Sequence, residues 1–260
     1  MCGLFGIIGN KNIDINFVRS CLINRGPDFS KSIEFDNSIF FHSRLSIQDL
    51  SHSANQPFLN KKKNIALLFN GEIYNCDFLR KKLVRNNIFL NTNCDTEIIL
   101  KGFEFFGFPF LKEIDGIYAV AIWDNTKKEL ILTRDPFGIK PLYYSLDNSS
   151  ISFASEISVF KGRDISKESI RNYQLWGSIL EPLSGLEGIK KFPCGYIGRW
   201  KYGNELEFIE KKEVNFVSNN IYDPKKYLDI VSETKKILEI CIKLQTVGDV
   251  EIASFLSGGV

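Results

Sequence analysis

The sequence begins Cys2-Gly3-Leu4-Phe5-Gly6-Ile7-Ile8-Gly9, directly after the initiator methionine. If that methionine is removed, Cys2 becomes the first residue and carries a thiol and a free α-amine on the same carbon. The amine titrates near ~8 and the thiol near ~8.5, so the amine can accept the thiol proton close to neutral pH. This is the arrangement of an N-terminal nucleophile. A lone cysteine is more often an inert core residue, so the interpretation depends on the rest of the chain.

The composition is that of an ordinary globular protein without a strong electrostatic partner. The chain has 260 residues, of which 44% are hydrophobic and 25% charged, with a formal net charge of +2. The basic triplet Lys61-Lys62-Lys63 is predicted to be a solvated hairpin tip, and nucleic-acid binding is not expected. No run approaches the roughly 18 apolar residues of a membrane span, and the N-terminus lacks a signal-peptide pattern. We therefore expect no membrane partner.

The cysteines stand far apart and form no CxxC pair, and the chain has only two histidines, so no metal site is expected. Unpaired cysteines indicate a reducing compartment. The sequence therefore predicts a cytoplasmic protein whose thiols stay free.

Short apolar runs bounded by turn residues predict strands, and apolar residues at helical spacing predict helices. The strands are expected over 4–8, 39–47, 65–69, 118–124, 129–134, 140–145, 150–154 and 250–256. The helices are expected over 15–23, 76–86, 167–175 and 224–244, and another is expected to begin near Asp95 or Thr96 as its N-cap. Short antiparallel strands around helices predict an α+β fold of stacked sheets with helices outside.

The chain resembles the glutaminase domain of glutamine-hydrolysing asparagine synthetases in seven segments that follow in the family's order. They are CGLFGIIG (2–9), RGPD (25–28), RLSIQDL (44–50), NGEIYN (70–75), CDTEIIL (94–100), IDGIYAVAIWD (114–124) and DPFGIKPLYY (135–144). The resemblance implies a four-layer αββα N-terminal-nucleophile hydrolase sandwich over residues 2–200. It further implies a linker over 201–222 and the truncated start of an α/β ATP-pyrophosphatase domain over 223–260.

The resemblance makes Cys2 the nucleophile that hydrolyses glutamine to glutamate and ammonia. Attack on the side-chain amide creates an oxyanion, which needs hydrogen-bond donors. The matched donors are the Asn70 side-chain amide and the Gly71 main-chain N–H, which we expect at a tight turn ending a strand, where glycine permits an unusual backbone angle and close approach. Taken alone, Asn70-Gly71 would be an ordinary hairpin turn.

Glutamine also presents an α-carboxylate and an α-ammonium. The planar guanidinium of Arg44 suits the carboxylate, and the resemblance gives the ammonium to Asp95 and the Glu72 region. The remaining expected glutamine contacts are Leu45 and Ile47. By resemblance, Arg25 and Asp28 order the pocket wall; judged as residues alone, they would form an internal ion pair that holds a turn.

The segment VEIASFLSGGV (250–260) resembles the family's entry into its synthetase domain. Leu256, Ser257, Gly258 and Gly259 would begin a loop whose backbone N–H groups surround pyrophosphate. The resemblance implies ATP and Mg²⁺ as cofactors of the full-length protein and none for the glutaminase half. In the family, the ammonia amidates aspartate to give asparagine.

Several departures from the family pattern leave the acceptor open. Asn24 stands where histidine is common, Cys194 interrupts a Pro-Pro-Gly, and residues 175–182 look more like paralogues associated with surface-polysaccharide gene clusters. A carboxylate on a sugar is therefore an alternative acceptor. A non-catalytic glutaminase-like scaffold is an alternative from another class. A homodimer is also left open.

Overall fold

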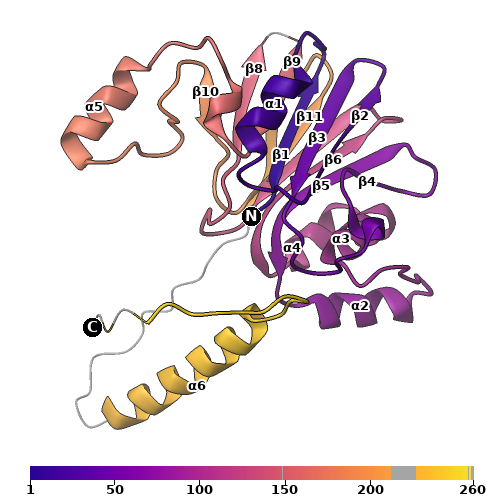
Figure 1. Cartoon of the computed structure of the whole chain (residues 1–260), viewed down its shortest axis with the longest axis vertical. Coiled ribbons are helices and arrows are strands. Elements are labelled where there is room, and N and C mark those ends of the chain that lie inside the picture. The colour runs from indigo at the N-terminus through magenta and orange to yellow at the C-terminus, as the bar shows by residue number, and fades with distance from the viewer. Residues whose placement is uncertain (148, 212–226, 257, 259–260) are drawn as a thin grey trace.

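The computed structural model describes the chain except residues 148, 212–226, 257 and 259–260 (Figure 1). Two six-stranded antiparallel sheets dominate the described part. The first sheet has the order β10-β8-β9-β1-β3-β2, and the second has the order β12-β11-β7-β6-β5-β4. The first comprises β1 (Gly3–Ile8), β2 (Phe29–Phe35), β3 (Ser38–Arg44), β8 (Tyr143–Asp147), β9 (Ser150–Ala154) and β10 (Ile189–Lys191). The second comprises β4 (Phe58–Leu59), β5 (Ile65–Ile73), β6 (Gly116–Asp124), β7 (Glu129–Arg134), β11 (Tyr196–Lys201) and β12 (Glu207–Lys211).

Helices cover the outer faces of both sheets (Figure 1). The first sheet is covered by α1 (Ile15–Leu22), and the second by α2 (Cys76–Arg85), α3 (Asp95–Phe106) and α4 (Phe108–Glu113). The other helices of the described residues are α5 (Lys167–Trp176), α6 (Tyr227–Gln245) and the short 3₁₀ segments η1 (His52–Ala54) and η2 (Ile157–Val159). Among them α6 has no buried residue.

The layering follows from the two-residue period of a strand. On β5, Leu67 and Phe69 pack outward against the helices, while Ala66 and Leu68 pack inward against the first sheet. Burying both faces of this strand explains its continuous apolar run. The predicted αββα layering is confirmed.

Three predicted elements need correction. The strand expected at 140–145 begins at Tyr143, because Asp135 draws the preceding segment into a loop by accepting hydrogen bonds from main-chain N–H groups up to Lys140. The N-cap of α3 is Cys94, so Asp95 is its first helical residue. Within the range expected to be a linker, residues 207–211 form β12, which pairs with β11, and residues 212–222 of that range lie outside the described residues.

The strand expected over 250–256 is not formed. A strand needs a neighbour for its main-chain hydrogen bonds, and none of the described strands lies beside this segment. Leu256 is 97% exposed. Of the expected nucleotide loop, Ser257 and Gly259 lie outside the described residues, and Gly258 has φ 68°.

Candidate functional site

The two sheets place the predicted nucleophile and oxyanion donors on facing surfaces. Cys2 directly precedes β1, where Leu4 points between the sheets, so the alternation of a strand turns Cys2 the same way. On β5 the same rule gives Asn70 the inward direction of Leu68. The antiparallel register of β1 and β3 brings Arg44 beside Cys2. The site therefore lies between the sheets, at the end of the sandwich where β1 begins.

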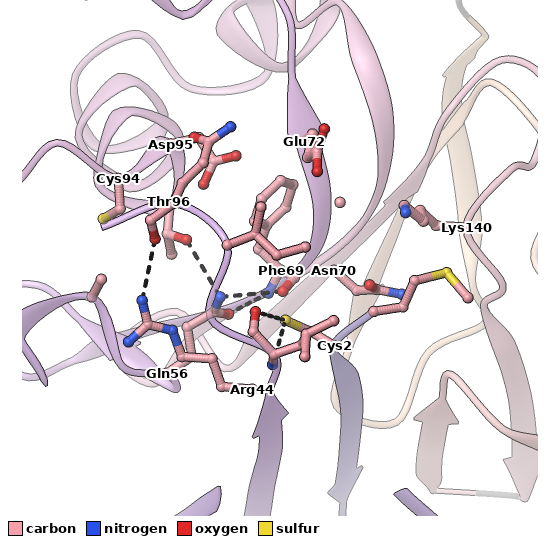
Figure 2. A pocket seen from close by; sticks show the side chains of 16 residues that line it. Cys2, Arg44, Gln56, Phe69, Asn70, Glu72, Cys94, Asp95, Thr96 and Lys140 are labelled. Carbon is pink, nitrogen blue, oxygen red and sulfur yellow. Dashed lines mark hydrogen bonds between the residues drawn. The ribbon is translucent and has the colours of Figure 1, made fainter. Parts of the chain in front are cut away.

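All eight residues predicted for catalysis and glutamine binding line one pocket (Figure 2). They are Cys2, Arg44, Leu45, Ile47, Asn70, Gly71, Glu72 and Asp95. They come from the residue before β1, the end of β3 and the segment after it, the last part of β5 and the start of α3, so the tertiary fold alone brings them together.

The sulfur of Cys2 is held by the main chain of Leu45. The Leu45 nitrogen lies 3.5 Å from Sγ, and Sγ lies 3.7 Å from the Leu45 oxygen. Burial raises the pKa of the Cys2 thiol, and the hydrogen bond from Leu45 and the nearby α-amine oppose that rise. The resting group is therefore a thiol that needs a base.

A base is at hand in the terminal amine. Burial lowers the pKa of the α-amine of Met1, and the positive charges of Lys140 and Arg25 lower it further. A lowered pKa keeps more of the amine neutral at physiological pH, which is the form that accepts a proton. Removal of Met1 would place the amine on Cys2 itself.

The side-chain amide of Asn70 is buried, with 1% of the residue exposed, and its Nδ2 has no hydrogen-bond partner among the described residues. A buried donor without a partner costs about 1–3 kcal/mol. The cost is removed when a ligand oxygen binds there, so this nitrogen is suited to receive an oxyanion.

Gly71 lies inside β5 and not in a turn, which corrects the sequence prediction. It pairs with Tyr118 of β6, and a Cβ at Gly71 would lie 2.1 Å from the Ile117 oxygen. The expected close approach is therefore present, between β5 and β6, whereas the expected unusual backbone angle is not, since Gly71 has no positive φ.

The Gly71 N–H direction follows from the register. Both main-chain groups of Tyr118 bond Asp135: its nitrogen donates to Oδ2 at 3.3 Å and its oxygen accepts from the Asp135 nitrogen at 2.9 Å. The Gly71–Tyr118 pair is thus a non-hydrogen-bonded pair. The Gly71 N–H points away from β6, to the edge of β5 that borders the pocket.

Arg44, which was predicted to bind the α-carboxylate of glutamine, also contacts a loop beside the pocket. Its Nη1 donates to the Ser51 oxygen at 2.9 Å and to Asn55 Oδ1 at 2.6 Å, and its Nη2 donates to the carbonyls of Gln48 and Asp49. The guanidinium therefore both lines the pocket and holds the loop over residues 48–55.

The carboxylates of Asp95 and Glu72 and the side-chain ammonium of Lys140 also line the pocket. Burial raises the pKa of Asp95 to about 7, and the charge of Glu72 adds to the rise. Burial also raises the pKa of Glu72, while Lys140 opposes that shift. Buried carboxylates of this kind are stabilised by a cation, and the α-ammonium of an amino acid would supply one.

Arg25 and Asp28 lie behind the pocket and do not line it. Arg25 pairs with Glu156, and Asp28 accepts from the Ser46 nitrogen at 2.7 Å. The alternative of an internal Arg25–Asp28 pair is therefore wrong. Asp28 supports the segment that carries Leu45.

The sequence prediction of the site missed four polar residues of the pocket: Gln48, Gln56, Thr96 and Lys140. Gln48, Thr96 and Lys140 stand within the segments that carry the family resemblance, and Gln56 lies between two of them, but only the spatial contacts place these residues at the pocket. Among the described residues, no group of three or more His, Cys, Asp or Glu side chains could hold a metal ion. None of the described helices combines the length and apolar content needed to cross a membrane.

The fold matches that of class II glutamine amidotransferases. It aligns with glutamine phosphoribosylpyrophosphate amidotransferase from B. subtilis at a TM-score of 0.60, with 18% identity, over 82% of this chain and 50% of that one. The structure of an allosteric regulatory enzyme of purine biosynthesis gives a TM-score of 0.63 at 18% identity, over 82% of this chain and 50% of that one.

Residues 1–209 match the family model of the glutamine amidotransferase domain, so the chain belongs to this family. It is 31% identical to a putative glutamine-hydrolysing asparagine synthetase of Methanocaldococcus jannaschii, with 100% of this chain and 55% of the relative aligned. It is 30% identical to asparagine synthetase B of Escherichia coli, over 100% of this chain and 43% of the relative. The amidase chyE of Penicillium rubens is 31% identical, over 91% of this chain and 35% of the relative. The chain thus spans about half or less of these relatives.

Proposed function

We propose that this chain hydrolyses glutamine to glutamate and ammonia, with Cys2 as the nucleophile. The observation that carries the proposal is the buried Asn70 Nδ2, which has no partner among the described residues and lines the same pocket as the thiol. An inert scaffold would gain nothing from leaving this donor unpaired.

The chemistry follows from the groups present. After removal of Met1, the α-amine of Cys2 accepts the thiol proton, and the sulfur attacks the glutamine side-chain carbonyl. Asn70 Nδ2 and the Gly71 N–H receive the oxyanion. The C–N bond breaks with return of the proton to the leaving nitrogen, which gives ammonia and a thioester on Cys2. Water then attacks the thioester, the amine takes its proton, and glutamate leaves with the thiol restored.

The substrate's ends are assigned by charge. Asp95 and Glu72 would receive the α-ammonium, and Arg44 would receive the α-carboxylate. The terminal nitrogens of Arg44 already hold the loop over 48–55. Binding of the substrate carboxylate to Arg44 would therefore also affect the position of that loop.

We further propose that the whole protein uses the ammonia to amidate aspartate at the expense of ATP. The support is the alignment of the full chain with asparagine synthetases at about 30% identity. The similar identity to a relative with another name, the amidase chyE, leaves the acceptor open, and a different carboxylate, such as one on a sugar, stays the alternative. Formation of AMP and asparagine by the full-length protein, with aspartate compared against other carboxylates, tests this step.

The hydrolysis is tested on the purified chain. The intact mass should correspond to a chain that starts at Cys2, and glutamate release should be lost in Cys2→Ala and retained in the control Cys21→Ala, which alters a cysteine on α1 outside the pocket. Full activity in Cys2→Ala would refute the proposal. Retained Met1 with no hydrolysis would favour the non-catalytic scaffold.

A further inference from the structure

The edge of β5 that faces away from β6 changes its partner along its length. Leu67 pairs with Phe58 of β4, and Phe69 lies beyond the start of β4. There the side chain of Gln56 replaces a strand. The Phe69 nitrogen donates to Gln56 Oε1 at 2.6 Å, and Gln56 Nε2 donates to the Phe69 oxygen at 3.2 Å. A side-chain amide offers the same donor and acceptor as a peptide, so it continues the ladder past Pro57, which has no N–H.

The next residue on this edge is Gly71, whose N–H has no described strand beside it. Phe69 and Gly71 flank Asn70, so fixing the Phe69 peptide also fixes where both oxyanion donors point. His42 adds a second contact, with its Nε2 3.1 Å from the Phe69 oxygen. Burial lowers the pKa of His42 to about 4, so the neutral ring donates this hydrogen bond from Nε2.

Gln56 also reaches the other end of the pocket. Its Nε2 lies 3.3 Å from Thr96 Oγ1, and Thr96 follows Asp95 in the first turn of α3. Gln56 is 4% exposed and lines the pocket (Figure 2). One buried amide therefore joins the strand that carries the oxyanion donors to the helix that carries the ammonium-binding carboxylate.

We infer that Gln56 is a positioning residue that sets the separation between the oxyanion donors and Asp95, and thereby selects glutamine over asparagine. The inference rests on the proposed function. Asparagine is one methylene shorter, so it cannot place its amide at Asn70 and Gly71 while its ammonium remains at Asp95. If the distance between the oxyanion donors and Asp95 is fixed, only glutamine can reach both. One methylene typically changes kcat/KM by about 10–200-fold.

The test compares Gln56→Met, which keeps a similar length but makes no hydrogen bonds to Phe69 or Thr96, with the unaltered chain. We expect kcat for glutamine to fall about 100-fold, as for a small misplacement of reacting groups. The glutamine-to-asparagine ratio of kcat/KM should fall about 10-fold or more. The rate of Cys2 alkylation by iodoacetamide should stay unchanged, because that reagent uses neither subsite.

A second variant separates the contact of Gln56 with α3 from its contacts with β5. Thr96→Val removes only the contact to α3, so it should raise the KM for glutamine and lower the ratio while kcat is largely kept. The matched control is Asn60→Leu. Asn60 is also a buried amide, 5% exposed, and its Oδ1 accepts from the Ile65 nitrogen at 3.1 Å at the opposite end of β4.

Binding gives the same comparison without turnover. Calorimetry of L-glutamine and L-asparagine on Cys2→Ala, with and without Gln56→Met, should show a reduced preference for glutamine in the double variant. Unchanged ratios in both assays, or an equal effect of Asn60→Leu, would overturn the role of Gln56. Failure of the unaltered chain to hydrolyse glutamine would count instead against the proposed reaction, and the binding ratio would still decide the role of Gln56.

Discussion

The main-chain nitrogen of Leu45 lies 3.5 Å from the sulfur of Cys2, across 43 residues of sequence. Leu45 directly follows Arg44, the last residue of β3. The end of one strand thus delivers both a hydrogen-bond donor to the Cys2 sulfur and a guanidinium to the pocket. Because β1 and β3 are paired along their length, this relationship is built into the sheet and does not depend on a bound substrate.

Gly71→Ala should abolish most of the activity. Its Cβ would lie 2.1 Å from the Ile117 oxygen, so β5 must shift and the Gly71 N–H must move with it. Loss of one oxyanion donor typically lowers kcat about 10²–10³-fold, which steady-state kinetics would measure. The control is Gly203→Ala at φ 81° in open space, which should strain the backbone but leave kcat intact. Normal kcat in Gly71→Ala would contradict the assignment of the oxyanion donors.

The KM for glutamine should rise as the pH falls through about 7. The pKa of Asp95 is raised to about 7 mainly by burial, so below that pH the free protein loses the charge that attracts the ammonium. Steady-state kinetics at about pH 6 to 8 would show this rise in KM. Asp95→Asn should have a high KM without this pH dependence.

The carboxylate of Asp95 should also make the stability of the fold depend on pH. The direction is opposite to that of a salt-bridged acid, whose pKa is lowered in the folded state. A folded-state pKa above the unfolded value means that stability falls as the pH rises from about 4 to about 7. Asp95→Asn should therefore raise the melting temperature more at the alkaline end of this window than at the acid end. An equal shift at all pH values would contradict the raised pKa.

Lys140→Met should move the acid limb of the kcat/KM profile to higher pH. Burial is the first cause of the lowered pKa of the Met1 α-amine, and the Lys140 charge adds to it. Because Lys140 and Cys2 line the same pocket, we expect the Lys140 charge to act in the same direction on the α-amine of Cys2 once Met1 is removed. Removing that charge raises the amine pKa, so a higher pH is needed to obtain the neutral base. Lys128→Met, which removes an exposed lysine paired with Asp36, is the control. A shift to lower pH would contradict the proposed base.

Asp249→Ala should weaken glutamine binding. After α6 the chain returns to the loop over the pocket: Asp249 Oδ2 accepts from the Asp49 nitrogen at 2.8 Å, and the Asp249 nitrogen donates to the Ile47 oxygen at 2.8 Å. Loss of one such hydrogen bond, about 1 kcal/mol, should raise KM about fivefold with little change in kcat. Asp229→Ala on the exposed surface of α6 is the matched control, and equal KM values in the two variants would contradict the coupling.

The limits of the sequence prediction have a common physical cause. Asn70-Gly71 reads locally as a turn, yet the pairing of β5 with β6 from Ile65 to Ile73 overrides that preference. The apolar segment 250–256 reads as a strand, but a strand forms only beside a partner. Gln56 lies outside the segments that carry the resemblance, and Lys140 lies within one but was not predicted at the site, because both reach the pocket only through contacts with residues distant in sequence.

The types of side chain at the site and the layers of the fold can be predicted from local sequence. A thiol beside the N-terminus, a carboxamide, an arginine and an acidic pair are side-chain properties, and the two-residue alternation of β5 is a local pattern. Which of these groups face each other depends on tertiary packing. Only the tertiary structure showed that Gly71 is needed for strand contact, that Arg44 holds the pocket loop, and that Gln56 joins β5 to α3. These are relations between distant segments, and they exist only once the sheets and helices have packed.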